Sequence, residues 1–219
     1  MMSSLSVTFI LIFGLALVVA LGCSKEDKAG DTSGQTGATA DSAAPMTRWD
    51  SLATIRYPVR DENNKFVTLV TDYGNMTLEL YRDVAPVHAD SFVARVQDGF
   101  YDNSTFFRVI DNFMIQGGDP TGTGRGGPGY QFADELDPKT ASYQAGYVRG
   151  VVAMANSGPN TNGSQFFIMH QDYPLDHNYT IFGRVVTGLE VVDAIATSKT
   201  DATDRPLEEI KIKKAEVVE

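Results

Sequence analysis

Residues 106–120 have the sequence FFRVIDNFMIQGGDP, and this stretch decides how the rest of the chain is interpreted. It begins as an apolar run that contains a single cation, Arg108, and it ends in a Gly-Gly pair and a proline, which predict a turn. A cation among aromatic and β-branched residues is costly to bury unless it is paired or takes part in chemistry. Arg108 is therefore the first candidate for a functional residue.

A second informative stretch, residues 154–168, has the sequence MANSGPNTNGSQFFI. It predicts a strand, a long turn rich in Asn, Gly, Ser and Pro, and a further strand that contains two aromatic residues. Asn and Gly in such a turn adopt unusual backbone angles and bond to free amide groups. A purely structural role therefore explains the glycines and residues 160–162.

Residue patterns on both sides of these stretches predict short strands and two helices. The β-branched run 66–71 and the alternating run 76–81 flank turn residues, which predicts a hairpin. Apolar spacing predicts a helix over 84–97 with Asp83 as its N-cap and a shorter helix over 189–196 after Gly188. Further strands are predicted at 105–110, 114–116, 147–156, 165–170, 180–186 and 210–218, with a Gly-rich loop at 117–130. This order favours a mainly β fold, a closed barrel capped by two helices, over βαβ units.

Composition excludes several classes of function. The chain has 219 residues, with 18 Lys and Arg against 28 Asp and Glu, so its net charge of −10 disfavours nucleic acid as a partner. Its one cysteine rules out an internal disulfide, and its three histidines lack the spacing of a metal site, so no metal or other cofactor is expected. The GxGxxG pattern at 122–127 lies outside a βαβ unit and predicts a loop. Ser164, His170 and Asp176 lack the context of a hydrolase triad.

The N-terminal region predicts export and a membrane tether. Residues 5–22 are nearly all apolar and uncharged, and the following Cys23 completes a pattern that resembles the lipobox of bacterial lipoproteins, in which the cysteine is lipidated. The alternative is an uncleaved transmembrane anchor, because the run is just long enough to span a bilayer. We predict a signal peptide at 1–22, a lipidated Cys23 with a flexible linker at 23–60, and a folded domain at 61–219. Either alternative places the domain outside the cytoplasm.

Taken together, the runs FFRVIDNFMIQGGD and MANSGPNTNGSQFFI closely resemble the two signature motifs of the cyclophilin family of peptidyl-prolyl isomerases. The resemblance covers roughly residues 66–218. It implies an eight-stranded antiparallel closed barrel capped by two helices, in agreement with the residue patterns. It also implies catalysis of cis/trans exchange at the bond before proline in polypeptides. Separately, we expect the protein to be a monomer.

The same resemblance assigns roles to individual positions. Arg108 matches the catalytic arginine of the family, and Gln116 matches the glutamine beside it. The positions implied for substrate binding are Phe113, Met114, Phe167, Leu175 and Tyr179 in the proline pocket, Ala155, Asn156 and Ser157 along the groove, and Gly124 at the rim of a neighbouring pocket. Tyr179 stands where the family has histidine, and it still offers a hydrogen-bond donor.

The chemistry explains why an arginine is needed. Rotation about an amide bond faces a barrier of ~18–20 kcal/mol because it breaks the amide resonance. In the twisted transition state the proline nitrogen gains a lone pair, which a guanidinium can bind and which the planar ground state does not offer. Arginine presents fixed, planar, always charged donors, and Gln116 is expected to accept from it and orient it.

The sequence departs from the family pattern at two places, and the second of them, at residues 173–179, leaves another function open. Phe107 stands where histidine is common, and residues 173–179 depart from the family's W-L-D-G-K-H run. The missing tryptophan predicts weaker binding of cyclosporin. The leading hypothesis is an isomerase that assists the folding of exported proteins, and the alternative is a proline-peptide-binding chaperone module whose catalysis is incidental.

Overall fold

The computed structural model describes residues 63–218. Along this part of the chain the elements are β1 (Lys65–Thr71), β2 (Gly74–Leu80), α2 (Pro86–Gln97), β3 (Ser104–Thr105), β4 (Arg108–Ile110), β5 (Met114–Gly117), α3 (Ala141–Ala145), β6 (Val151–Met154), β7 (Phe166–Met169), β8 (Ile181–Thr187), α4 (Leu189–Ala196) and β9 (Lys211–Val218). The predicted signal peptide, Cys23 and the linker to residue 60 lie outside the described residues. None of the helices within 63–218 is long and apolar enough to cross a bilayer.

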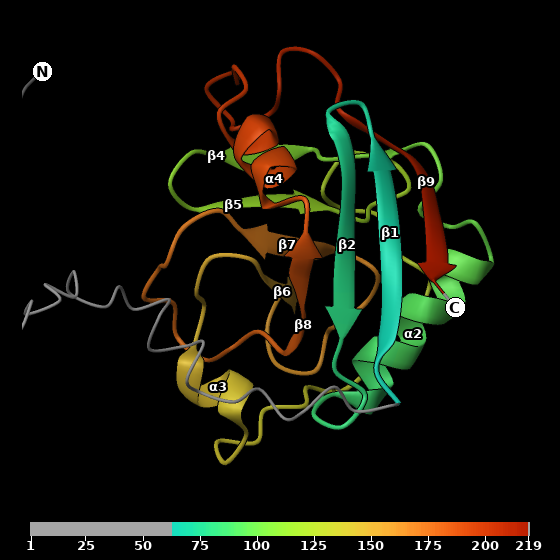
Figure 1. Cartoon of the computed structure of the whole chain (residues 1–219), viewed down its shortest axis with the longest axis vertical. Helices are drawn as coiled ribbons and strands as arrows, with labels where there is room; N and C mark the ends of the chain where they lie inside the picture. The colour runs from blue at the N-terminus through green and yellow to red at the C-terminus, as the bar shows by residue number, and fades with distance from the viewer. Residues whose placement is uncertain (1–62, 219) are drawn as a thin grey trace, which may run out of the picture. The chain divides into compact units, whose positions relative to one another are not determined.

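The strands form one curled antiparallel sheet, which confirms the mainly β prediction (Figure 1). The order across the sheet is β3-β9-β1-β2-β8-β6-β7-β5-β4. The predicted hairpin is the β1–β2 pair, in which Lys65 lies opposite Leu80 and Thr71 lies opposite Gly74. Nearly every strand therefore has a partner on both sides, and only β3 and β4 are left at the two ends of the order.

These two end strands are neighbours in the chain, and their connection closes the sheet. Only Phe106 and Phe107 separate β3 from β4. The backbone N–H of Phe106 donates to Ile210, just before β9, at 3.0 Å, and that of Phe107 donates to Gln116 of β5 at 3.1 Å. The predicted single strand 105–110 is thus two short strands, because consecutive residues bond to opposite ends of the sheet. Counted as one bent strand, β3 and β4 reduce the nine strands to the predicted eight.

The predicted helices are present, with one correction and one addition. Helix α2 begins at Pro86 after Ala85, and not at a cap made by Asp83. Proline suits the first turn because its missing N–H would have no partner within the helix. Helix α4 follows Gly188, whose φ of 86° is the left-handed conformation that glycine adopts readily. The five-residue helix α3 was not predicted, since it is too short to show helical periodicity.

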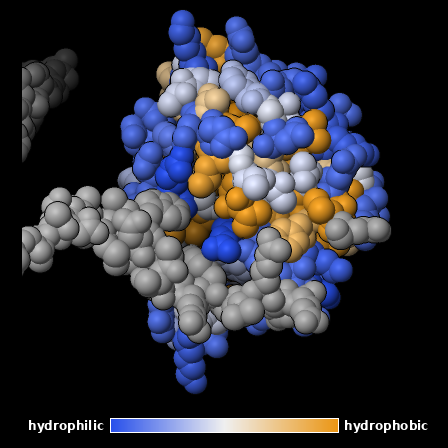
Figure 2. Space-filling model, viewed as in Figure 1, coloured by the Kyte–Doolittle hydropathy of each residue, from blue (hydrophilic) through white to orange (hydrophobic). Residues whose placement is uncertain are grey.

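The two longer helices cover different parts of the sheet. Helix α2 packs against β1, β8 and β9, whereas α4 packs against β2, β4 and β5 (Figure 1). In the same view, apolar residues gather over the middle of the face that carries β1, β2 and β8, and hydrophilic residues surround them (Figure 2). The predicted site residues lie in a different part of the fold, on strands β4, β5 and β7 and on the loops next to β5, β6 and β7.

Two apolar cores lie on opposite faces of β7, and they explain why all four of its residues are buried. Phe166 and Ile168 join the larger core, which also contains Phe92 of α2. Phe167 and Met169 join a second, smaller core. Since successive side chains of a strand point to opposite faces, a continuous apolar strand serves both cores. The smaller core forms the base of the candidate site.

Candidate active site

Strand register brings Arg108 and the predicted pocket residues onto one face of the sheet. Arg108 lies opposite Gln116 in the β4–β5 pair, and Gln116 lies opposite Phe167 in the β5–β7 pair. Directly opposite residues share a face, so these three side chains form a row. The next row along the strands is Ile110, Met114 and Met169, which alternation places on the same face.

The apolar residues predicted for the proline pocket belong to the smaller core. Met114 and Phe167 are 2% and 5% exposed, so they form the floor of the pocket. The other predicted pocket residues, Phe113, Leu175 and Tyr179, are partly buried and form its walls. Ala155, which was assigned to the groove, is also partly buried in this core. The structure therefore brings together every apolar residue that the sequence assigned to the pocket.

Arg108 is half exposed, and an anion lies beside it. Its side chain is 43% exposed, so the cost of a buried cation, which first drew attention to it, does not arise. Its Nε lies 3.5 Å from Oδ2 of Asp204, a residue of the loop between α4 and β9. Asp204 was not among the predicted site residues, because no local pattern links it to Arg108.

Gln116 has a different polar partner from the one expected. Its side-chain nitrogen donates to Oε1 of Gln165 at 3.1 Å, and Gln165 in turn donates to the backbone oxygen of Gly126 at 2.8 Å. This chain of bonds ties β5 to the Gly-rich loop. The predicted role of Gln116 in orienting Arg108 stays a prediction.

A polar groove of about 740 Å³ runs beside the apolar cluster. It contains the remaining predicted positions, Gln116, Gly124, Asn156 and Ser157, and it shares Ala155 with the apolar cluster. Its far wall is the Gly-rich loop. The predicted site thus has two connected parts, one apolar and one polar, with Ala155 where they meet.

Hydrogen bonds hold the walls of this site in place. Nδ2 of Asn156 donates to the backbone oxygen of Asn178 at 2.8 Å, which links the groove to the 173–179 wall. The hydroxyl of Tyr147 donates to the backbone oxygen of Tyr179 at 2.8 Å and accepts from its N–H at 3.0 Å. Burial raises the pKa of Tyr147 to about 12, so the hydroxyl keeps the proton that it donates.

The Gly-rich loop is built around one buried carboxylate, that of Asp119. Asp119 is fully buried and accepts hydrogen bonds from the backbone N–H groups of Thr121, Thr123, Gly124 and Gly126 at 2.6–3.1 Å. Burial raises the pKa of this carboxyl, but the hydrogen bonds outweigh it, so the pKa lies below its ordinary value. The loop wall of the groove is therefore a fixed structure.

Phe107 fits this loop as a packing residue. It is 8% exposed, and a Cβ placed on Gly124 would lie 3.1 Å from Cε2 of its ring. Gly124 thus lets the loop backbone rest directly on the aromatic ring. The aromatic residue at the usual histidine position supports the groove rim from below.

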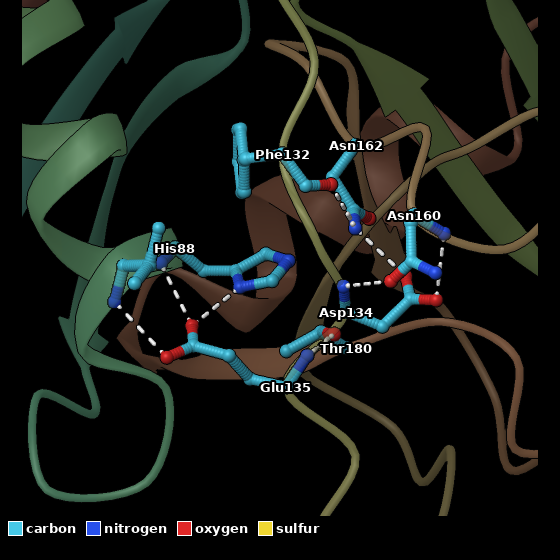
Figure 3. A network of polar contacts seen from close by, with 8 residues as sticks. His88, Phe132, Asp134, Glu135, Asn160, Asn162 and Thr180 are labelled. Atoms are coloured by element: carbon cyan, nitrogen blue, oxygen red, sulfur yellow. Dashed lines mark hydrogen bonds and ion pairs between the residues drawn. The ribbon is translucent and has the colours of Figure 1, made fainter.

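A polar network connects the groove to helix α2 (Figure 3). Glu135 accepts from the backbone N–H groups of Val87 and His88, at 3.2 and 3.0 Å, and from the ring of His88 at 2.6 Å. It therefore supplies the N-terminal cap that was expected from Asp83. The neighbouring Asp134 accepts from Asn162 and from the N–H of Asn160, which hold the turn that follows Asn156.

The structure also shows the surroundings of residues that were considered for a metal site or a hydrolase triad. Within 63–218 no group of three His, Cys, Asp or Glu side chains is arranged to hold a metal ion. His170 is buried behind the pocket and accepts from the backbone N–H of Asn112 at 3.0 Å. The hydroxyl of Ser164 donates to the backbone oxygen of Gly118 at 2.8 Å, which is a structural bond.

Comparison with known sequences identifies related proteins. Residues 66–217 match the family model described as cyclophilin type peptidyl-prolyl cis-trans isomerase/CLD. The chain is 50% identical over 157 residues to the Gibberella zeae protein named peptidyl-prolyl cis-trans isomerase-like 1, which covers 70% of this chain and 94% of that protein. It is 45% identical over 157 residues to the Arabidopsis thaliana isomerase CYP18-2, covering 70% and 93% of the two chains. These relatives are eukaryotic and give no support to the lipoprotein prediction.

Solved structures agree in fold. A crystal structure of a cyclophilin type peptidyl-prolyl cis-trans isomerase from Cryptosporidium parvum has a TM-score of 0.67 and 38% identity, covering 71% of this chain and 98% of that one. A second structure of that protein, obtained in the presence of the dipeptide Ala-Pro, has a TM-score of 0.66, also at 38% identity, covering 70% and 99%.

Proposed function

The chain belongs to the cyclophilin family of peptidyl-prolyl cis-trans isomerases, and from this premise we propose that Arg108 is its catalytic donor. The observation that carries the proposal is the row of Arg108, Gln116 and Phe167 across three strands, beside the apolar cluster. The cluster offers a proline ring an apolar seat, and the guanidinium lies at its edge. The related structure obtained with Ala-Pro supports a proline dipeptide as the core of the substrate.

The reaction needs no nucleophile and no base. As the amide twists, its nitrogen becomes pyramidal and its lone pair localises, and a terminal N–H of Arg108 donates to that lone pair. Since the planar ground state has no such lone pair, the interaction stabilises the transition state selectively. The apolar cluster holds the ring still and keeps water away, which strengthens this one polar contact.

An arginine substitution tests the assignment. A charge-assisted hydrogen bond contributes about 1.5–3 kcal/mol, and each 1.36 kcal/mol is tenfold in rate, so we expect Arg108→Ala to lower kcat/KM by about 10- to 150-fold. Exchange of an Ala-Pro peptide, followed by NMR line shapes without a coupling protease, measures this. Arg82→Ala, which also removes an arginine paired with an aspartate (Asp90) but lies outside the groove lining and the apolar cluster, is the matched control. Equal activity of Arg108→Ala and wild type would contradict the assignment.

We further propose that the isomerase works outside the cytoplasm, tethered by a lipid on Cys23, on exported proteins. The support is the apolar run 5–22 directly before the single cysteine of the chain. The mass of the mature N-terminus is the test, and a lipid-bearing Cys23 as first residue is the expected result. Cys23→Ser abolishes membrane association if the lipid is the anchor, and leaves it intact if residues 5–22 are an uncleaved anchor.

The second candidate function is a chaperone module that binds proline-containing peptides. The altered wall at 173–179 favours this function. Tyr173 is 45% exposed, and the centroid of its ring lies 4.4 Å from that of Phe113. Tyr173 therefore extends the aromatic surface beyond the pocket. If Arg108→Ala restores a deletion phenotype as well as wild type does, the binding function is the important one. If it fails to do so while remaining folded, catalysis is.

A further inference from the structure

We propose that Asp204 is a positioning residue for the isomerisation, because its carboxylate holds the guanidinium of Arg108 from the Nε side. This rests on the proposed role of Arg108 as the donor. Oδ2 of Asp204 lies 3.5 Å from Nε, and among residues 63–218 it is the only ion-pair partner of Arg108. Arginine has five N–H donors, and a contact at Nε leaves the four on the terminal nitrogens for substrate.

The backbone of Asp204 is fixed next to Arg108 independently of this ion pair. Its carbonyl oxygen accepts from the N–H of Val109, the residue after Arg108, at 2.8 Å. Asp204 also has a φ of 64°, which is uncommon outside glycine and costs energy unless surrounding contacts impose it. A carboxylate held in this way has a fixed place relative to β4.

The surrounding contacts come from a compact loop between Lys199 and Leu207. The carboxylate of Asp201 accepts from the N–H and hydroxyl of Thr203, both at 2.7 Å, and from the N–H of Arg205 at 3.1 Å. The N–H of Asp201 donates back to Arg205 at 2.8 Å, and Leu207 donates to Lys199 at 2.9 Å. The loop therefore closes on itself around Asp201 and presents Asp204 at its tip.

The same loop is attached to the Gly-rich wall of the groove. Nη2 of Arg205 donates to the backbone oxygen of Gly122 at 2.8 Å. Gly122 belongs to the turn built around Asp119, since its own N–H donates to the backbone oxygen of Asp119 at 3.1 Å. Asp204 and Arg205 thus connect the catalytic strand and the groove wall through one short segment.

Two effects of the carboxylate oppose each other. It restricts the arginine rotamers, which otherwise carry substantial entropy, and this favours catalysis. It also neutralises part of the charge that the transition state uses. The pair is exposed to solvent, so the electrostatic effect is small, and we conclude that orientation dominates.

Two substitutions test this without straining the backbone. Asp204→Asn removes the charge and keeps the shape, and Asp204→Gly removes the side chain, while both residues tolerate a positive φ. We expect either substitution in the full chain to lower kcat by about two- to five-fold with KM unchanged, in proportion to the modest strength of exposed ion pairs. Glu208→Gln, at an exposed residue that directly follows this loop, removes the same charge and is expected to retain wild-type kcat.

Salt and a double substitution separate positioning from a structural effect. At 1 M salt the screening length is about 3 Å, so the advantage of wild type over Asp204→Asn shrinks if the charge acts on Arg108. In an Arg108→Ala background, Asp204→Asn has no further effect. The proposal is overturned if the Asp204 variants have wild-type or raised kcat. It is also overturned if Asp204→Asn lowers kcat as much in the Arg108→Ala background as it does in the wild-type protein. If Arg108→Ala alone is fully active, the catalytic assignment and the positioning role both fail. If Arg108→Ala is impaired as expected while the Asp204 variants keep wild-type kcat, only the positioning role is refuted.

Discussion

At some positions of this protein, the close approach of two backbone segments requires a glycine. Gly118 joins β5 to the Gly-rich loop with a φ of 85°, and a Cβ there would lie 2.3 Å from the backbone oxygen of Ser164. Gly129, in the same loop, has a similar φ of 83° with nothing within 4 Å of the added Cβ. Substitutions at these two glycines therefore distinguish the free-energy cost of an unusual φ from the free-energy cost of a steric clash.

We expect Gly118→Ala to destabilise the protein by about 2–3 kcal/mol more than Gly129→Ala does. Both variants pay about 1–2 kcal/mol for a left-handed alanine, and only the first must also move backbone atoms of the β7 approach. Urea unfolding measures the difference. Equal midpoints would mean that the loop shifts away from Ser164 at no cost.

At the scale of elements, the β4–β5 hairpin carries Arg108 at one end and Phe113 near its turn, so its orientation decides whether donor and pocket face the same substrate. His170 anchors the turn, because Nδ1 accepts from the N–H of Asn112 at 3.0 Å and the backbone N–H donates to Phe113 at 2.8 Å. On its other side, Nε2 lies 3.3 Å from Asp193 of α4. The imidazole thus links the hairpin to the helix that packs on it.

We expect His170→Ala to lower kcat/KM by about three- to tenfold, since the N–H of Asn112 loses its acceptor in a partly buried hydrogen bond, at a cost of about 1 kcal/mol. His170→Asn places an amide oxygen near the position of Nδ1 and should recover most of the activity. Kinetics of both variants with the Ala-Pro peptide provide the measurement. If the two variants behave alike, the hydrogen bond to Asn112 is unimportant.

At the scale of the whole molecule, the network of Figure 3 makes stability depend on pH. Burial lowers the pKa of His88, and its bond to Glu135 opposes this only in part. The folded protein therefore keeps His88 neutral at a pH where the unfolded chain, with a histidine pKa near 6.5, binds a proton. This contribution to stability is complete above about pH 6.5 and is lost as the pH falls below it.

We expect the free energy of unfolding to decrease between pH 7 and pH 5, with His88 contributing at most about 1.4 kcal/mol per pH unit. His88→Gln keeps an amide donor for Glu135 and should show a shallower decrease. Urea titrations at closely spaced pH values compare the two slopes. Parallel slopes for the two proteins would assign the pH dependence to other groups.

The local sequence alone determined several secondary-structure elements of this protein. The alternation of Met76 to Tyr81 and the turn before it fixed a hairpin, and the apolar spacing after residue 84 fixed a helix, because both patterns follow from the period of the element. The two-residue period of a β-strand places Arg108, Met114 and Phe167 on one face once the register of their strands is known. The pocket residues and the family were predicted differently, from the resemblance of the runs at 106–119 and 154–168 to the two cyclophilin motifs.

Other features were decided only by tertiary structure, because they depend on residues that are distant in the chain. Glu135, and not Asp83, caps α2, since the loop after the groove returns to that helix end. The strand at 105–110 divides because Phe106 and Phe107 bond to opposite ends of the sheet. Asp204 lies beside Arg108 only because the barrel closes there. Sequence periodicity reports which way a side chain points along its own element, and it carries no information about which distant side chain comes to face it.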